Sequence, residues 1–183
     1  LGRNPMFTLV AALSLALGIG ANAALFNIFN SVLWRPLPVD APERLVRVYS
    51  RSGTAPFHDQ FPWLEFEDYA ADRSFDGLAA YTFAECALAA PGQEAMRVYG
   101  EAVSGNYFAV LRPGMQLGRG FNPDEGLTIG RDPIVVIGDR LWRRRFGADR
   151  GIVGRTITLN GRAFTVVGVA APEFRGVFAI YFA

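Results

Sequence analysis

The chain has 183 residues, of which 51% are hydrophobic and 19% are charged, and its formal net charge is +1. After the first 34 residues, 17 arginines balance 17 acidic side chains, which excludes a basic nucleic-acid-binding face and an acidic tail. The sequence has no lysine, so it excludes a Schiff-base or P-loop lysine, and its single cysteine excludes an internal disulfide and a multi-cysteine zinc site.

The amino-terminal segment 6–34 is uncharged and is long enough to cross a membrane. As a helix, its 29 residues extend about 43 Å, whereas the hydrocarbon core of a bilayer is about 30 Å thick. We therefore predict a transmembrane helix within residues 1–34, spanning about 6–34, that is tilted or projects from the bilayer as a stalk. Small residues recur at every fourth position, which either lets another helix approach closely or reflects an alanine-rich composition: Ala12, Ala16, Gly20 and Ala24.

Two other interpretations of this segment stay open. Arg3, the apolar run to Gly20 and the sequence Ala21-Asn22-Ala23 resemble a signal peptide with its cleavage site, but ten more uncharged residues, 24–33, favour a retained helix. A buried helix of a soluble core is the third possibility. More arginines follow the segment than precede it, and the charges alone leave its orientation undecided because the positive-inside rule weakens for long domains.

We predict that residues 35–183 form one domain of mixed α/β (α+β) class, with no internal repeat. After a proline-rich joint at 35–42, we expect a strand at 45–50 and a helix from Pro62 whose inner face is Phe66, Tyr69 and Ala70. Strands at 77–82 and 96–103 should follow, and then a short helix to Leu111 that is capped by Ser104. The last expected elements are a loop at 112–131, a strand at 133–137 and a helix from Gly138 to Phe146.

The clearest local signal is Asn160-Gly161 between two alternating segments. This pair is typical of a type I′ β-hairpin, since both turn residues need positive φ. A two-residue loop predicts that Ile157 lies opposite Phe164 and Thr156 opposite Thr165. The second strand should end before Pro172.

The residues most capable of chemistry do not form a recognisable site. His58 is the only histidine and has Asp59 beside it, but no G-x-S-x-G motif accompanies them, so a surface histidine is favoured. Several acidic residues follow Pro62: Glu65, Glu67, Asp68 and Asp72. Their helical spacing favours a solvent-exposed helix face over the pair of catalytic carboxylates that a glycosidase needs.

Four further motifs also favour structural roles. Asp124-Glu125 lacks the EF-hand pattern, and nothing beside Cys86 predicts a lowered thiol pKa. Gly118-Arg119-Gly120 lacks the third glycine of a dinucleotide loop, and Arg143–Arg145 are typical of the exposed face of an amphipathic helix. The sequence therefore predicts no catalytic, cofactor-binding or metal-binding residue.

Several stretches together resemble the MacB/FtsX-type permeases of ABC transporters, and most closely their acidobacterial duplicated orphan subgroup. The similarity covers nearly the whole chain and includes LGIGANAA at 17–24, FNSVLWRPLP at 29–38, FDGLAAY at 75–81, VSGNYF at 103–108, LGRGF at 117–121, LWRRRFG at 141–147, LNGRAFTVVGV at 159–169 and PEFRG at 172–176.

The resemblance implies a bacterial inner-membrane protein whose residues 35–183 form a periplasmic core domain. It also implies a fragment, with three more membrane helices expected after the domain. The permease would be non-catalytic and would couple ATP hydrolysis by a separate cytoplasmic ATPase subunit to export or to mechanotransmission. Expected partners are the lipid bilayer, that ATPase, a second permease copy or half, and a periplasmic adaptor as a further candidate; no cofactor or nucleic acid is expected.

Other classes remain compatible with the sequence. A single-span, membrane-anchored extracytoplasmic binding or sensor domain fits the same layout of one helix and one domain. A secreted domain would follow from cleavage after Ala23, and a membrane-anchored hydrolase is the least supported class because no site was recognised.

Overall fold

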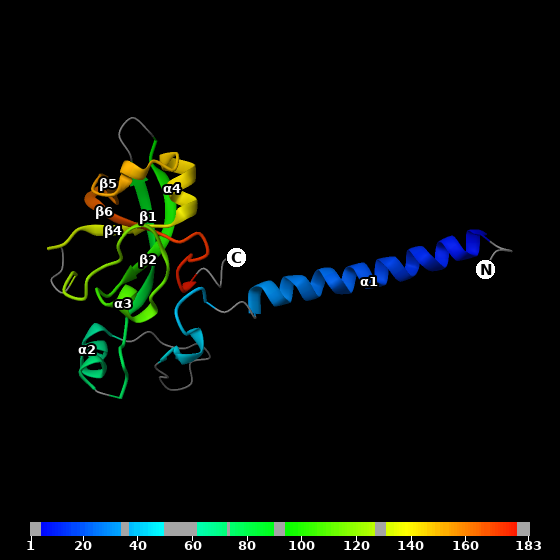
Figure 1. The fold of residues 1–183 in the computed structure, drawn as a ribbon, viewed down its shortest axis with the longest axis horizontal. Coiled ribbons are helices and arrows are strands. Elements are labelled where there is room, and N and C mark those ends of the chain that lie inside the picture. Colours follow the sequence, from blue (N-terminus) through cyan, green and yellow to red (C-terminus); the bar gives the residue numbers. More distant parts are fainter. Residues whose placement is uncertain are drawn as a thin grey trace. The chain divides into compact units, whose positions relative to one another are not determined.

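The structure, a computed structural model, describes residues 5–33, 37–49, 62–72, 74–89, 94–126 and 131–178. The chain divides into two compact units (Figure 1). One contains helix α1, and the other extends from Leu37 to Ala179.

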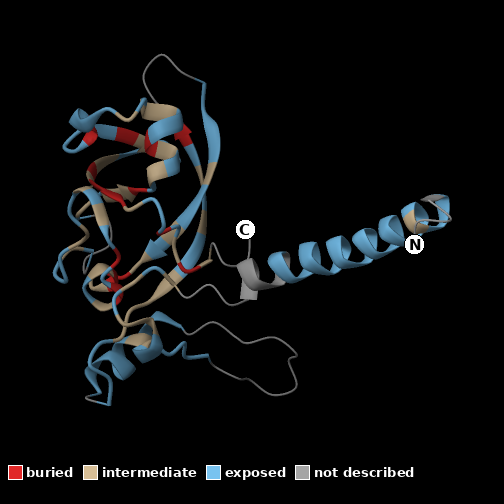
Figure 2. Cartoon of the chain, turned by 45° about the vertical axis from the view of Figure 1, so that its right-hand side comes forward, coloured by how far each residue is buried: buried red, intermediate tan, exposed pale blue. Residues whose placement is uncertain are grey.

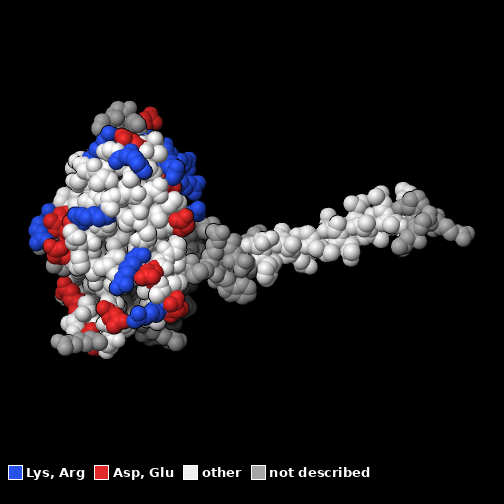
Figure 3. All heavy atoms as spheres, viewed as in Figure 1, with Lys and Arg blue, Asp and Glu red and all other residues white. Residues whose placement is uncertain are grey.

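Helix α1 (Pro5–Leu33) is the long apolar helix that the sequence predicts. Its stretch Met6–Asn27 is long and apolar enough to cross a membrane, judged by length and composition. Large side chains along it are exposed, Leu17 by 80%, and the helix is drawn almost wholly exposed in Figure 2. Figure 3 shows no charged atoms along it, whereas both signs of charge are scattered over the domain. An apolar surface of this kind is stable only in an apolar surrounding.

The domain combines one mixed sheet with short helices, which confirms the predicted α+β class. In the described part of the chain the strands are β1 (Tyr81–Ala89), β2 (Met96–Val103), β3 (Met115–Gly118), β4 (Ile134–Ile137), β5 (Thr156–Leu159) and β6 (Arg162–Ala170). The helices are α2 (Trp63–Ala71), α3 (Tyr107–Leu111) and α4 (Asp139–Phe146), with 3-10 turns at η1 (Pro42–Arg44) and η2 (Arg150–Ile152).

Strand β6 is the centre of the sheet. The order is β2-β1-β5-β6-β3, and β4 pairs with β6 in parallel while the other described pairs are antiparallel. β6 can pair with three strands because it has nine residues: β5 and β3 bond to its two ends, and β4 runs along Thr165–Val169. β2 pairs only with β1 among the described strands and therefore forms an edge.

The β5–β6 hairpin is formed as predicted. Ile157 pairs with Phe164 and Thr156 with Thr165, and the turn residues Asn160 and Gly161 have φ angles of 49° and 77°. The Asn160 side chain also accepts a hydrogen bond from the backbone N–H of Ala87 at 2.7 Å. The turn therefore fixes the hairpin and holds its tip to β1.

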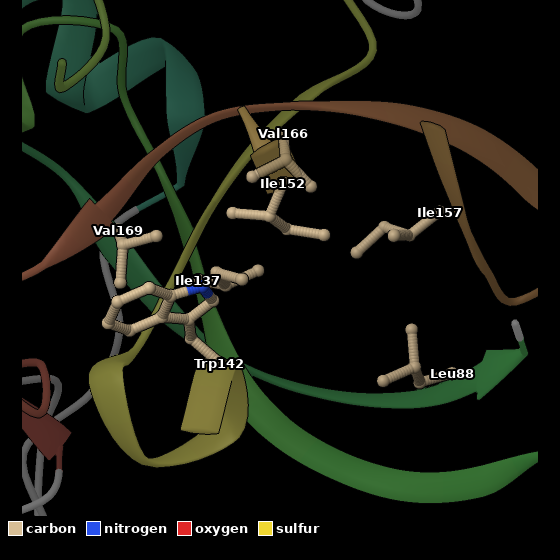
Figure 4. Packing of buried hydrophobic residues seen from close by; sticks show 7 residues of the cluster. All are labelled: Leu88, Ile137, Trp142, Ile152, Ile157, Val166 and Val169. Carbon is tan, nitrogen blue, oxygen red and sulfur yellow. The ribbon is translucent and has the colours of Figure 1, made fainter. Parts of the chain in front are cut away.

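The first hydrophobic cluster lies between the sheet, α4 and η2 (Figure 4). Trp142 is 4% exposed, and its indole N–H donates to the carbonyl of Asp149 at 2.8 Å, so the ring is buried with its polar atom satisfied. The sticks in Figure 4 come from β1, β4, β5, β6, α4 and η2 and are directed into one interior: Leu88, Ile137, Trp142, Ile152, Ile157, Val166 and Val169.

Several predicted elements match the structure closely. The strand at 96–103 is β2, the strand at 133–137 is β4 without its proline, and the helix after Gly138 is α4. The helix expected from Pro62 is α2, with Pro62 at its N-cap position.

Other predictions are wrong for reasons of long-range pairing. Residues 45–49 form no strand, because only Leu45 packs inward and no described strand pairs with them. The strand expected at 77–82 begins at Tyr81 and continues to Ala89, since its partner β2 supplies hydrogen bonds along that length. The loop expected at 112–131 contains β3, which pairs with β6.

Two details of the predicted helices also need correction. On α2 only Phe66 of the expected inner face is half-buried, while Tyr69 and Ala70 are exposed. Ser104 does not cap α3, whose N-cap residue is Asn106. Instead, the Ser104 hydroxyl accepts from the N–H of Ala80 and donates to Asn106, so it joins the start of β1 to the turn before α3.

Candidate functional site

The region best suited to a functional role is a second hydrophobic cluster, here called the junction. Its buried residues are Tyr107, Leu111, Ala170, Phe174 and Val177. Residues from the segment that opens the domain pack against them: Leu37, Val39 and Leu45. We call residues 37–45 the entry segment and residues 171–178 the exit segment. The two segments are far apart in sequence but share this one cluster.

Glu101 of β2 connects the exit segment to helix α3. One of its carboxylate oxygens accepts a hydrogen bond from the Tyr107 hydroxyl at 2.6 Å, and the other accepts from the backbone N–H of Phe178 at 2.5 Å. Hydrogen bonds to an ionised group are stronger than neutral ones. The single carboxylate thus fixes both the aromatic centre of the junction and the end of the exit segment.

Burial is the main reason that the pKa of Tyr107 is raised far above its ordinary value, and the hydrogen bond to Glu101 adds to this effect. The ring is 2% exposed, and its hydroxyl remains a proton donor at any physiological pH. Ionisation of Tyr107 therefore does not break its contact with Glu101 at physiological pH.

Gly176 permits the exit segment to pass close to Glu101. Its φ is +90°, and a Cβ atom there would lie 2.7 Å from a Glu101 carboxylate oxygen. Any other residue would be strained in this backbone conformation and would collide with the carboxylate. The glycine of the motif at 172–176 thus has a steric role in the junction.

Arg47, which follows the entry segment, makes a second set of contacts with the exit segment and with β1. Its guanidinium carbon lies 4.7 Å from the ring centre of Tyr49, 5.2 Å from that of Tyr81 and 5.6 Å from that of Phe178. The Tyr81 and Phe178 rings meet edge-on, with their centres 5.3 Å apart. At solvent-exposed sites, each cation–π contact at such a distance stabilises the fold by about 0.5–1 kcal/mol. The arginine thus ties residues just beyond the entry segment to β1 and to the exit segment.

The acidic and histidine candidates do not converge in the described residues. His58 and Asp59 lie outside the described residues. Glu65, Glu67, Asp68 and Asp72 are exposed around α2, where Glu67 accepts from the Trp63 indole and Asp72 from Ser74. Their separate partners and exposure fit the solvated face that the sequence predicts.

Glu125 has a well-defined structural partner. Both of its oxygens accept from the Arg119 guanidinium at 2.7 Å, and one also accepts from the N–H of Asn122. The hydrogen bonds from Arg119, supported by the one from Asn122, lower the pKa of Glu125 to about 2 although partial burial opposes the shift. This pair closes the loop after β3 and leaves Asp124 exposed.

The glycines at 118 and 120 are required by close packing. A Cβ on Gly118 would meet the backbone carbonyl of Val167, and one on Gly120 would lie 2.5 Å from the Phe108 side chain. Cys86 is half-buried in β1 opposite Val98. These residues thus have packing environments that account for their presence without a ligand.

The arginine run on α4 is not uniformly exposed, contrary to expectation. Arg143 is exposed and paired with Asp139 one turn earlier at 2.9 Å, and Arg144 is exposed. Arg145 is half-buried and donates to the carbonyl of Glu94 at 2.6 Å. It therefore anchors α4 to the start of β2.

Metal coordination finds no support in the described part of the chain, where no group of three or more His, Cys, Asp or Glu side chains could hold an ion. The prediction that the chain has no catalytic or cofactor-binding residue stays a prediction. Sequence reasoning missed Arg47 and Glu101 altogether. The available signal for Glu101 was an acidic residue near the end of a strand, a few residues before Tyr107.

The fold of the domain is similar to that of two solved extracytoplasmic regions of ABC-type transporters. One similar structure is the extracellular domain of the noncanonic ABC-type transporter YknZ from Gram-positive bacteria, with a TM-score of 0.52, 15% identity, and coverage of 61% of this chain and 57% of that one. Another is the periplasmic region of MacB from Actinobacillus actinomycetemcomitans, with a TM-score of 0.51, 19% identity, and coverage of 63% and 53%. The chain thus spans little more than half of each.

Residues 8–182 match the family of MacB-like periplasmic core domains, and the chain belongs to this family. The resemblance noted in the sequence is thereby confirmed at the level of the family. No curated protein matches the chain significantly.

Proposed function

We propose that this chain supplies the first membrane-spanning helix and the extracytoplasmic domain of an ABC transporter permease in the bacterial inner membrane. Its amino terminus would lie in the cytoplasm and its domain in the periplasm. A separate cytoplasmic subunit would bind and hydrolyse ATP, and this chain would carry the resulting movement to the periplasm for export or mechanical signalling. Family membership and the apolar stretch Met6–Asn27 support the proposal.

The observation that carries the proposal is the junction. The entry segment follows α1 in sequence, and the exit segment ends the described domain, so these are the two places where force from membrane helices would arrive. A flexible linker would absorb a displacement. The junction is instead closely packed and is held by the hydrogen bonds of Glu101. A displacement of the entry or exit segment would therefore also move α3 and the sheet.

The proposal includes partners as well. A cytoplasmic ABC ATPase and a second permease copy or half would complete the transporter, with a periplasmic adaptor as a further candidate. The chain itself would hold no cofactor, and its contribution would be mechanical rather than catalytic.

The first test concerns membrane topology. In a Cys86→Ala background, Ala163→Cys places a single thiol at an exposed position of the β5–β6 hairpin. We expect a membrane-impermeant maleimide to label it in intact spheroplasts, and the chain to stay in the membrane after alkaline carbonate extraction. Labelling only after lysis would contradict a periplasmic domain, and release by carbonate would favour a secreted one.

The second test separates a permease from an anchored sensor. The natural protein is purified with the ATPase encoded beside it and reconstituted in vesicles, with an environment-sensitive dye on Ala109→Cys, an exposed position of α3. We expect ATP to change the dye's fluorescence, because movement of the entry segment reaches α3 through the junction. An anchored sensor would show no response to ATP.

A further inference from the structure

Arg47 lies among three aromatic rings that come from three separate segments of the domain. Tyr49 follows the entry segment, Tyr81 begins β1, and Phe178 ends the exit segment. The guanidinium carbon lies within 5.6 Å of all three ring centres. Because the faces of aromatic rings are partially negative, a cation placed among several of them attracts each one. One side chain therefore holds the residues that follow the entry segment against the end of the exit segment.

This contact differs from the junction in its exposure to water. Arg47 is exposed, and its neighbours Val46 and Tyr49 are exposed by 73% and 40%. In the junction, by contrast, Tyr107 is 2% exposed and Phe174 is 6% exposed. Cation–π contacts are weaker at exposed sites than at desolvated ones, and exposed side chains change rotamer within nanoseconds. The Arg47 contact can therefore open and close while the buried junction stays intact.

Phe178 takes part in both sets of contacts. Its backbone N–H donates to the Glu101 carboxylate at 2.5 Å, whereas its ring is the one that lies 5.6 Å from Arg47. The same ring meets Phe83 of β1 edge-on, with the centres 6.1 Å apart. Phe83 in turn stacks on Tyr99 of β2 at 5.8 Å. A row of rings thus leads from Arg47 across β1 to β2 without passing through α3.

This row is a second route from the entry side of the domain to its exit side. The junction connects the entry and exit segments through buried packing around Tyr107 and Phe174. The row connects residues 46–49 directly to Phe178 and to the β1–β2 pair. The direct route depends on a single cation and the buried route does not, so a change of that one charge separates them.

A neighbouring arginine has a different partner and supplies a matched control. Arg44, in the entry segment, is also exposed, and it forms an ion pair with Asp76 at 2.7 Å. Asp76 lies between α2 and β1 and is not part of the exit segment. Arg44 therefore tests what the loss of one exposed positive charge does near residues 46–49 when its partner is not an exit-segment ring.

We propose that Arg47 is a releasable clasp between residues 46–49 and the exit segment. Its positive charge closes the clasp, and the clasp opens when movement of the membrane helices draws the two segments apart. On opening, the Phe178 ring loses its cation while Glu101 still holds the Phe178 backbone. The inference rests on the proposed permease function and deepens it, because it names a contact that regulates how movement passes through the domain.

Distance measurements on the full chain in vesicles test the clasp. In the Cys86→Ala background, Val46→Cys and Ala163→Cys place spin labels at two exposed positions, one beside Arg47 and one on the β5–β6 hairpin. Pulsed electron paramagnetic resonance then reports how widely residues 46–49 vary in position relative to the sheet. Arg47→Met removes the charge but keeps a long side chain, whereas Arg47→Lys keeps the charge. Arg44→Met is the control.

Without ATP, we expect the distance distribution to be at least twice as broad with Arg47→Met as with the natural residue. Arg47→Lys should keep a width close to the natural one, because an ammonium group is also attracted to ring faces. Arg44→Met should leave the width unchanged. An unchanged width with Arg47→Met, or equal broadening with Arg47→Lys or Arg44→Met, would overturn the clasp.

ATP tests whether the clasp is released. With the ATPase present, we expect ATP to add a second distance to the distribution of the natural chain, and a single unchanged distance would overturn release. If ATP changes the dye signal on Ala109→Cys while Arg47→Met leaves the width unchanged, the permease function stands and only the clasp is wrong. If ATP changes neither signal and the Ala163→Cys thiol is not periplasmic, the proposed function fails and release fails with it.

Discussion

The hydroxyl of Tyr107 donates a hydrogen bond to Glu101 at 2.6 Å, and the same carboxylate holds the backbone of Phe178. One acidic side chain of β2 thus joins a helix and a segment 77 residues away along the chain. This arrangement makes the exit segment part of the packed interior of the domain.

Tyr107→Phe removes only the hydroxyl and should test that link. We expect a loss of about 1–2 kcal/mol in unfolding free energy, because the Glu101 oxygen loses a donor in a partly buried site. Thermal and urea unfolding of the detergent-solubilised chain, followed by tryptophan fluorescence, measure the change. Thr82→Val, which removes a hydroxyl from an exposed position of β1, is the control and should change stability by less than about 0.5 kcal/mol.

Trp142 should be the most sensitive residue of the first cluster. Trp142→Ala removes a ring that is 4% exposed and leaves the Asp149 carbonyl without its indole donor, so we expect a loss of about 3–5 kcal/mol. The unfolding free energy from circular dichroism at increasing urea reports this loss. Leu64→Ala on α2, where Leu64 is 73% exposed, should have little effect. Similar losses from both changes would contradict the described core.

The hairpin turn makes a separate prediction. Gly161→Ala places a side chain at φ 77° and should lower stability by about 1 kcal/mol. Asn160→Gly relieves the backbone at φ 49° but removes the acceptor for Ala87, whereas Asn160→Asp keeps that acceptor. We therefore expect Asn160→Asp to be the better tolerated of the two, as judged by melting temperature. The opposite order would show that the contact with Ala87 contributes little.

Glu125 makes the stability of the domain depend on pH. Because Arg119 and Asn122 lower the pKa of Glu125 from 4.5 to about 2, the folded state favours the ionised form. Its contribution is present above pH 4.5 and is lost as the pH falls towards 2. Melting temperatures of the natural chain and of Glu125→Gln should differ at pH 7 and converge at pH 2–3. The same change at the exposed Glu173 should produce no such convergence.

Helix α1 should transmit movement only while it is continuous. It extends to Leu33, beyond the apolar stretch that ends at Asn27. Placing proline or several glycines within 27–32 should break it there and uncouple ATP hydrolysis from the domain. With the dye on Ala109→Cys, we expect ATPase activity to persist while the ATP-dependent signal is lost. An unchanged signal, or unchanged export by the whole transporter, would contradict a stalk.

Local signals predicted the elements that depend on local chemistry. Asn160-Gly161 fixes its hairpin through two positive φ angles, and α4 follows from Gly138 and the spacing of Trp142 and Phe146. The extent of α1 follows from the absence of charge. Each of these features is determined by residues within a few positions of one another, and so the sequence alone reveals it.

Features that depend on distant partners could not be predicted in this way. β3 lies in a glycine-rich stretch and becomes a strand because β6 pairs with it, and the glycines are there because Val167 and Phe108 come close. The residues of the junction come from both ends of the described domain, as Leu37 and Val177 do. Glu101 and Phe178, which hydrogen-bond beside it, are 77 positions apart. No periodicity in a single segment indicates that an acidic strand residue accepts hydrogen bonds from both a tyrosine hydroxyl and the backbone N–H of a distant phenylalanine.

Strand β6 contributes residues to both hydrophobic clusters, one after the other along its length. Val166 and Val169 belong to the first, Ala170 belongs to the junction, and the exit segment begins at the next residue. A pull on that segment would load β6 along its own axis, against hydrogen bonds to three neighbouring strands at once. Hydrogen bonds that are loaded together along the strand resist a larger force than bonds that break one at a time. The sheet would therefore be the last part of the domain to unfold under tension.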